Sequence, residues 1–224
     1  MAAARKPYDA ITLFARPFIR HMDRLREVEH TILDLACQEI WLAAPWRWSL
    51  GLAETLTLTA SVQDIPFTTP PAGPSDLLYF AYVYLTDGIG PSRVLEVVPS
   101  LPADANLKGQ PSQVAFVAGS PAKMRLFPCP PSFTNTTRLI SVYKKTAPVI
   151  TRTNMHTAGV LVMDDDWFHV YCALVLFYAY KYADDPRAQA QYQEFQLRLA
   201  EMRKRERMPE WLSRNMVIEQ GQRE

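Results

Sequence analysis

Residues 109–144 read GQPSQVAFVAGSPAKMRLFPCPPSFTNTTRLISVYK, and this stretch decides the fold. Three short runs rich in strand-forming residues, at 113–117, 123–127 and 138–144, are separated by segments rich in proline and glycine. Proline has no backbone N–H to donate, and glycine tolerates the left-handed conformations that tight turns require. The pattern therefore predicts a short β-meander set between the flanking segments.

The β-rich character extends on both sides of this stretch. Thirteen of the 18 prolines fall within residues 66–148, which excludes a long helix there. Residues 56–62 alternate between aliphatic side chains and threonine or serine, which is typical of a strand with one face open to solvent. We expect antiparallel pairing, with turns at Asp87-Gly88 and Gly119-Ser120. The expected strands are 56–62, 77–86, 93–98, 113–117, 123–127 and 138–144.

Helices are expected before the β-rich region. Apolar residues recur every three or four positions from Leu25 to Ala43, which predicts a helix with one apolar face. Asp23 is a candidate N-cap for this helix, and Pro45 stands just beyond its end. A shorter helix is expected from about Tyr8 to Met22.

Helical structure is expected again from Asp166, with Asp164 and Asp165 in or just before the first turn. Asp185 followed by proline repeats this arrangement and begins a last helix that runs to about Arg207. That helix carries Glu–Arg pairs four residues apart, at 194 and 198 and at 201 and 205.

These expectations define the fold class as α+β. A helical bundle is built from residues 1–51 and 147–207, and it carries an antiparallel β-rich insertion at 52–146. Residues 208–224 form a C-terminal extended arm.

Composition limits the classes of function. With 24 basic and 23 acidic side chains the net charge is +1, so no global field draws the protein to nucleic acid or to an anionic membrane. The three cysteines cannot all pair, which favours a reducing compartment. The first residues lack an apolar signal core, and the run from Trp167 to Tyr180 is too short to span a membrane. We therefore expect no membrane association.

One cluster has the composition of a metal or acid–base site. Asp164, Asp165 and Asp166 lie close to His169, and carboxylates with an imidazole can ligate a divalent cation. A metal-dependent hydrolase using Asp164, Asp166 and His169 is one alternative function. The simpler interpretation is a capped helix start, because adjacent aspartates point in different directions.

Other candidates also have two interpretations. Trp46, Arg47 and Trp48 are able to stack on a base or a sugar, which allows a carbohydrate-binding β-module, or they anchor the junction of a helix and a strand. Cys37 and Cys172 are expected to be core residues. No nucleophile, phosphate-binding or dinucleotide pattern occurs, so we expect no enzymatic activity, no cofactor and no metal.

Two features favour partner binding. The run from Trp167 to Tyr180 is apolar on nearly every side, which suggests that a neighbouring subunit covers one face. The tail after Met208 is too apolar for a plain disordered end. Its candidate partner-binding residues are Trp211, Leu212, Met216, Val217 and Ile218.

The order of motifs along residues 20–207 resembles the head-to-tail adaptor family of tailed bacteriophages, which includes tail-adaptor, head-completion and tail-tubular-type proteins. The matching order is Trp46-Arg47-Trp48, the strands, Gly109-Gln110-Pro111, Leu126-Phe127-Pro128-Cys129-Pro130, a strand ending in Tyr143-Lys144, and Asp184-Asp185-Pro186-Arg187-Ala188 before a long charged helix.

This resemblance implies a structural virion protein. Its copies, about twelve, would close into a homo-oligomeric ring, because a head-to-tail contact repeated around an axis closes on itself. The ring would bind the portal protein on one side and tail or nozzle proteins on the other, and DNA would pass through its lumen without sequence-specific binding. The protein would be made in the host cytoplasm and end in the neck, or connector, of the virion.

Overall fold

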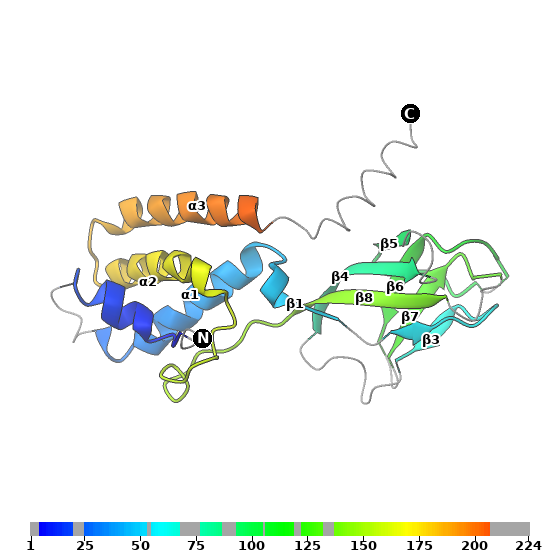
Figure 1. The fold of residues 1–224 in the computed structure, drawn as a ribbon, viewed down its shortest axis with the longest axis horizontal. Helices are drawn as coiled ribbons and strands as arrows, with labels where there is room; N and C mark the ends of the chain where they lie inside the picture. The colour runs from blue at the N-terminus through cyan, green and yellow to red at the C-terminus, as the bar shows by residue number, and fades with distance from the viewer. Residues whose placement is uncertain are drawn as a thin grey trace. The chain divides into compact units, whose positions relative to one another are not determined.

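The computed structural model describes residues 5–19, 25–52, 55–67, 77–86, 93–104, 106–118, 122–131 and 137–206. These residues combine helices with a curled mixed β-sheet, so the fold is α+β. They divide into two compact units, the first drawn from residues 1–49 and 147–206 and the second from residues 50–146. Figure 1 shows the elements of each unit.

The first unit is helical, and α2 contacts most of its other elements. The helix α2 packs against α1, α3 and the short π-helical segment η1, and together they share one hydrophobic core. The elements of this unit are η1 (Ile11–Ala15), α1 (Glu29–Ala43), η3 (Arg47–Ser49), η4 (Asp165–Trp167), α2 (Phe168–Tyr182) and α3 (Ala188–Arg205).

The apolar surface of α2 is covered by its own chain. Residues Val170 to Leu176 are all buried, and so are Ala179 and Tyr180 on the last turns. The suggestion that a neighbouring subunit covers one face of this helix is therefore wrong, because α1, α3 and η1 pack against it within one chain.

Two predicted helices are shorter than expected. The helix α1 begins at Glu29 rather than at Leu25, and no side chain caps its start at Val28. The expected cap, Asp23, lies outside the described residues. In the segment from Tyr8, regular helical structure is limited to η1 and the turns around it. Pro17 accounts for this early end, because it cannot donate a helical hydrogen bond.

The described residues of the second unit form a curled sheet of eight strands. Its order is β1-β8-β4-β5-β6-β7-β3, and β2 also pairs with β8. In Figure 1, β4 and β8 run side by side and form the longest pair. The strands are β1 (Leu50–Leu52), β2 (Leu56–Thr57), β3 (Asp64–Pro66), β4 (Leu77–Thr86), β5 (Arg93–Val97), β6 (Gln113–Val117), β7 (Lys123–Phe127) and β8 (Arg138–Lys145).

Three predicted strands, β4, β6 and β7, have the bounds expected from the sequence, and β5 and β8 differ by one residue. The prediction of antiparallel pairing is wrong for one pair, because β5 and β6 are parallel. The turns expected at Asp87-Gly88 and Gly119-Ser120 lie outside the described residues.

The predicted strand at 56–62 is also wrong over most of its length. Only β2 pairs as a strand, and Ser61 adopts a φ of 61° in a turn. The alternation of burial continues through Leu58, which is buried, and Thr59, which is exposed. The two short strands β1 and β3 were not predicted.

The interior of the curled sheet is apolar. Phe67, Phe80 and Phe116 form an aromatic group with ring centroids 5.7 to 6.3 Å apart. They come from the segment after β3, from β4 and from β6, so the group links the β3 end of the sheet order to two of its inner strands across one core.

Candidate functional site

The aspartates before α2 do not converge on a common point. Asp164 lies 3.5 Å from the Arg47 guanidinium, and its side chain makes no capping hydrogen bond. The Nδ1 atom of His169 lies 2.8 Å from the backbone oxygen of Asp166, and since a carbonyl only accepts, this nitrogen carries the proton.

The predicted side-chain cap by Asp164 is therefore wrong. At the helix start, the backbone carbonyl of Asp164, rather than its carboxylate, accepts the Trp167 N–H at 2.9 Å. Within the described ranges, no group of three or more histidine, cysteine, aspartate or glutamate residues is arranged to hold a metal ion.

The tryptophans of the Trp46-Arg47-Trp48 motif pack within the first unit. The Trp46 ring is buried in the core, and its indole nitrogen donates to the Ile40 carbonyl. The Trp48 ring stacks on Trp46 at 6.1 Å and meets Trp41 edge-on at 5.1 Å. Since these rings cover one another, the geometry favours the anchoring interpretation over a stacking platform for a ligand.

The cysteines behave as small core residues. Cys37 on α1, Cys129 and Cys172 on α2 are all buried and unpaired. Burial raises the pKa of the Cys37 thiol to about 12, and burial also raises the pKa of Cys172. Neither thiol forms the thiolate that a nucleophile needs at neutral pH.

The start and surface of α3 follow the prediction in part. The Asp185 carboxylate accepts the Arg187 N–H at 2.9 Å, and the Arg187 side chain also donates to it. The Glu194–Arg198 and Glu201–Arg205 pairs form with N–O distances of 2.8 and 2.5 Å. At the basic end of the helix, Arg203 donates to the Ala43 carbonyl at 2.9 Å, so this arginine joins α3 to the end of α1.

One carboxylate links the three long helices. Glu39 on α1 accepts a hydrogen bond from the Tyr178 hydroxyl of α2 at 2.6 Å and from the Tyr192 hydroxyl of α3 at 3.3 Å. Burial, together with the Glu39 carboxylate, raises the pKa of Tyr178. This link was not predicted, because its three residues are far apart in sequence.

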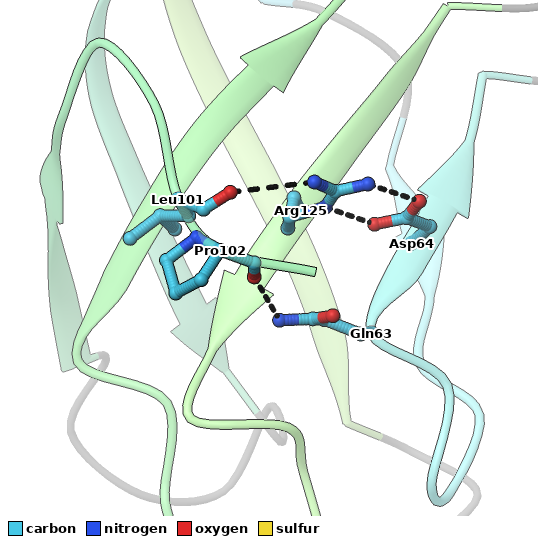
Figure 2. A network of polar contacts seen from close by, with 5 residues as sticks. All are labelled: Gln63, Asp64, Leu101, Pro102 and Arg125. Carbon is cyan, nitrogen blue, oxygen red and sulfur yellow. Dashed lines mark hydrogen bonds and ion pairs between the residues drawn. The ribbon is translucent and has the colours of Figure 1, made fainter. Parts of the chain in front are cut away.

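A polar clasp holds the long connection between β5 and β6. Arg125 on β7 donates through Nε and Nη2 to both oxygens of Asp64 on β3, at 2.7 and 2.8 Å. Its Nη1 donates to the Leu101 carbonyl at 3.3 Å, and the Gln63 amide donates to the Pro102 carbonyl at 3.0 Å (Figure 2). Two carbonyls of the connection are thus fixed to the edge of the sheet.

Backbone hydrogen bonds continue this attachment along the connection. The Cys129 N–H donates to the Leu107 carbonyl, and the Gly109 N–H donates to the Cys129 carbonyl, both at 2.9 Å. Ser112 donates to the Phe127 carbonyl at 3.0 Å. The connection from 98 to 112 is therefore held at both of its ends, and this allows β5 and β6 to lie parallel.

The family described as SU10 adaptor protein matches residues 14–217, and this range includes most of the first compact unit and residues 50–146 of the second. The chain belongs to the SU10 adaptor protein family. This is a family of bacteriophage adaptor proteins, so the chain is a phage structural protein and a component of the virion. Among curated proteins, none matches the chain.

The partner-binding residues predicted for this adaptor are not placed by the structure. Trp211, Leu212, Met216, Val217 and Ile218 lie outside the described residues. No helix in the described part of the adaptor combines the length and apolar character of a membrane span. Large apolar side chains that are clearly exposed include Leu13, Phe18, Leu42, Leu78, Tyr79, Val97, Leu107, Val149 and Leu197.

Proposed function

We propose that this adaptor forms a homo-oligomeric ring, of about twelve copies, between the portal protein and the tail or nozzle proteins of a phage virion. DNA passes through its lumen. The observation that carries this proposal is the family match over residues 14–217. Within the ring, residues 1–51 and 147–207 act as a helical bundle domain that carries the β-rich insertion of residues 52–146.

Charge supports a passive passage for DNA. The net charge of the chain is +1, and a strongly basic channel would retain the genome through counterion release. Basic side chains of the described residues are also engaged locally: Arg125 by Asp64, Arg187 by Asp185 and Arg205 by Glu201.

The C-terminal segment 208–224 is the proposed assembly arm. Its 17 residues reach about 55 Å when extended, which is far enough to lie on an adjacent subunit or on the portal. Trp211 is the expected anchor, because buried tryptophans dominate the energy of many interfaces.

Sedimentation of the full chain, alone and with the portal protein of the same phage, tests the proposal. A ring, or a complex with the portal, is expected, and EDTA should not change either. A monomer that ignores the portal and binds glycans would favour the carbohydrate-binding alternative. Turnover that EDTA abolishes would favour the metal-dependent hydrolase.

A further inference from the structure

One half of β4 has an open edge. The strand β8 pairs with β4 from Leu77 to Thr86. The strand β5, on the other edge of β4, pairs only with Val83, Tyr84 and Leu85. The β4–β8 register shifts at Leu78 and Ala81, and such irregularities bend a strand and increase its twist. Among the residues that the structure describes, no strand pairs with the second edge of Leu77–Tyr82.

The other sheet edges have features that discourage further pairing. The edge strand β3 contains Pro66, and its Asp64 is occupied by Arg125. The edge strand β1 has only three residues. Native proteins shield edges with proline, with charged side chains and with very short strands. The segment Leu77–Tyr82 contains no proline and no charged residue, so its bulges are the one such feature that it has within the described residues.

Exposed apolar side chains lie beside this edge. Leu78 is 43% exposed and Tyr79 is 48% exposed, and both belong to the unpaired half of β4. Val97 is 40% exposed and lies on β5 beyond its last pair with β4. A continued β4–β5 register would place Val97 opposite Ala81, but the structure pairs neither residue with the other. The backbone edge and an apolar border are thus available together.

We propose that the edge Leu77–Tyr82 receives the C-terminal segment of a second copy as an added β-strand. The segment supplies the uncharged run Asn215–Ile218, which ends in two β-branched residues. An extended chain that joins an open edge gains main-chain hydrogen bonds, and its alternate side chains pack beside the strand. An uncharged strand also suits an uncharged edge.

The chain between α3 and the pairing run gives this run reach away from its own helical unit. The described part of the chain ends at Glu206, one residue after α3, and residues 207–214 precede the pairing run. Eight extended residues span about 27 Å. The inference rests on the proposed function in one respect, which is that residues 208–224 act as an assembly arm.

Disulfide cross-linking between full-length chains tests the inference. One chain carries Leu78→Cys and the other Val217→Cys, and equal amounts are mixed and oxidised mildly with diamide. The native cysteines are buried, so they interfere little. The matched control replaces Leu107, which is 50% exposed in the same unit, by cysteine. We expect the 78–217 disulfide to form about tenfold more than the 107–217 disulfide.

Equal yields for the two pairs would overturn the inference. A 78–217 disulfide confined to single chains that carry both substitutions would also overturn it, because the occupant would then be the chain's own segment. As a second measure, Leu78→Lys should weaken self-association about tenfold, whereas Leu107→Lys should not. If rings form without the cross-link, only this inference fails. If the wild-type chain forms neither a ring nor a portal complex, the proposed function fails.

Discussion

Breaking the Asp64–Arg125 clasp should loosen the connection between β5 and β6. The pair forms two charge-assisted hydrogen bonds, and the side chains of Arg125 and Asp64 are only 18% and 29% exposed, respectively. A hydrogen bond to a charged group contributes about 1.5–3 kcal/mol net, and the remaining exposure reduces the sum. We therefore expect a coupling free energy of about 2 kcal/mol from a double-mutant cycle of Asp64→Asn and Arg125→Met.

Hydrogen exchange is the suitable assay for this cycle. The four tryptophans that the structure describes, Trp41, Trp46, Trp48 and Trp167, all lie in the first unit, so their fluorescence does not report directly on the second unit. The amides of Gly109, Ser112 and Cys129 hold the connection and should exchange about thirty-fold faster in each single mutant, as 2 kcal/mol implies. Arg152→Met is the control, because its pair with Glu27 is largely exposed and such surface pairs contribute little to stability.

The clasp also predicts a pH dependence. Hydrogen bonds from Arg125 lower the pKa of Asp64, so the folded state binds this proton less readily than the unfolded state does. The contribution to stability is complete above the ordinary aspartate pKa of about 4, and it is lost as pH falls through the lowered value. Asp64→Asn should remove this acid limb. Unchanged exchange at 109 and 112, together with a coupling below about 0.5 kcal/mol, would refute the reasoning.

Further predictions concern the helical unit and the arm. Glu39→Ala should lower the free energy of unfolding by about 1–3 kcal/mol, because two tyrosine hydroxyls lose their acceptor; urea denaturation followed by tryptophan fluorescence measures this. Replacing Asp164 and Asp166 by asparagine should change the free energy of unfolding by less than about 0.5 kcal/mol, since neither side chain caps a helix. The metal content of the native protein and of this double mutant should be the same. Deleting residues 208–224 should leave the melting temperature of the monomer nearly unchanged and weaken ring or portal association. If the deletion instead unfolds the monomer, and the fraction that stays folded still assembles, the assembly-arm hypothesis is wrong.

The strands were predicted best where proline or glycine borders a short run of strand-forming residues. Proline or glycine borders both β6 and β7, and nothing distant is needed to define either strand. The parallel pairing of β5 with β6 was not predictable in the same way. It depends on the connection fixed by Arg125 to the Leu101 carbonyl, a contact between residues 24 positions apart.

Short elements and boundaries depend on context as well. Residues 58–62 have a strand pattern, yet Ser61 adopts a left-handed turn there, and its N–H donates to the Pro130 carbonyl at 2.9 Å. Aspartate is a residue type that often caps helices, but the Asp164 side chain pairs with Arg47 from a distant segment. The residue types indicated which contacts these residues are able to make, and partners distant in sequence determined which contacts they make.

The copy number on the portal tests the adaptor account most directly. Native mass spectrometry of the full chain, alone and mixed with the portal protein of its phage, gives the mass of each assembly. A closed ring of about twelve copies should weigh about twelve times the 25.5 kDa of one chain, and the portal should retain the same number of copies. A chain that stays at 25.5 kDa both alone and in the presence of the portal would contradict the account.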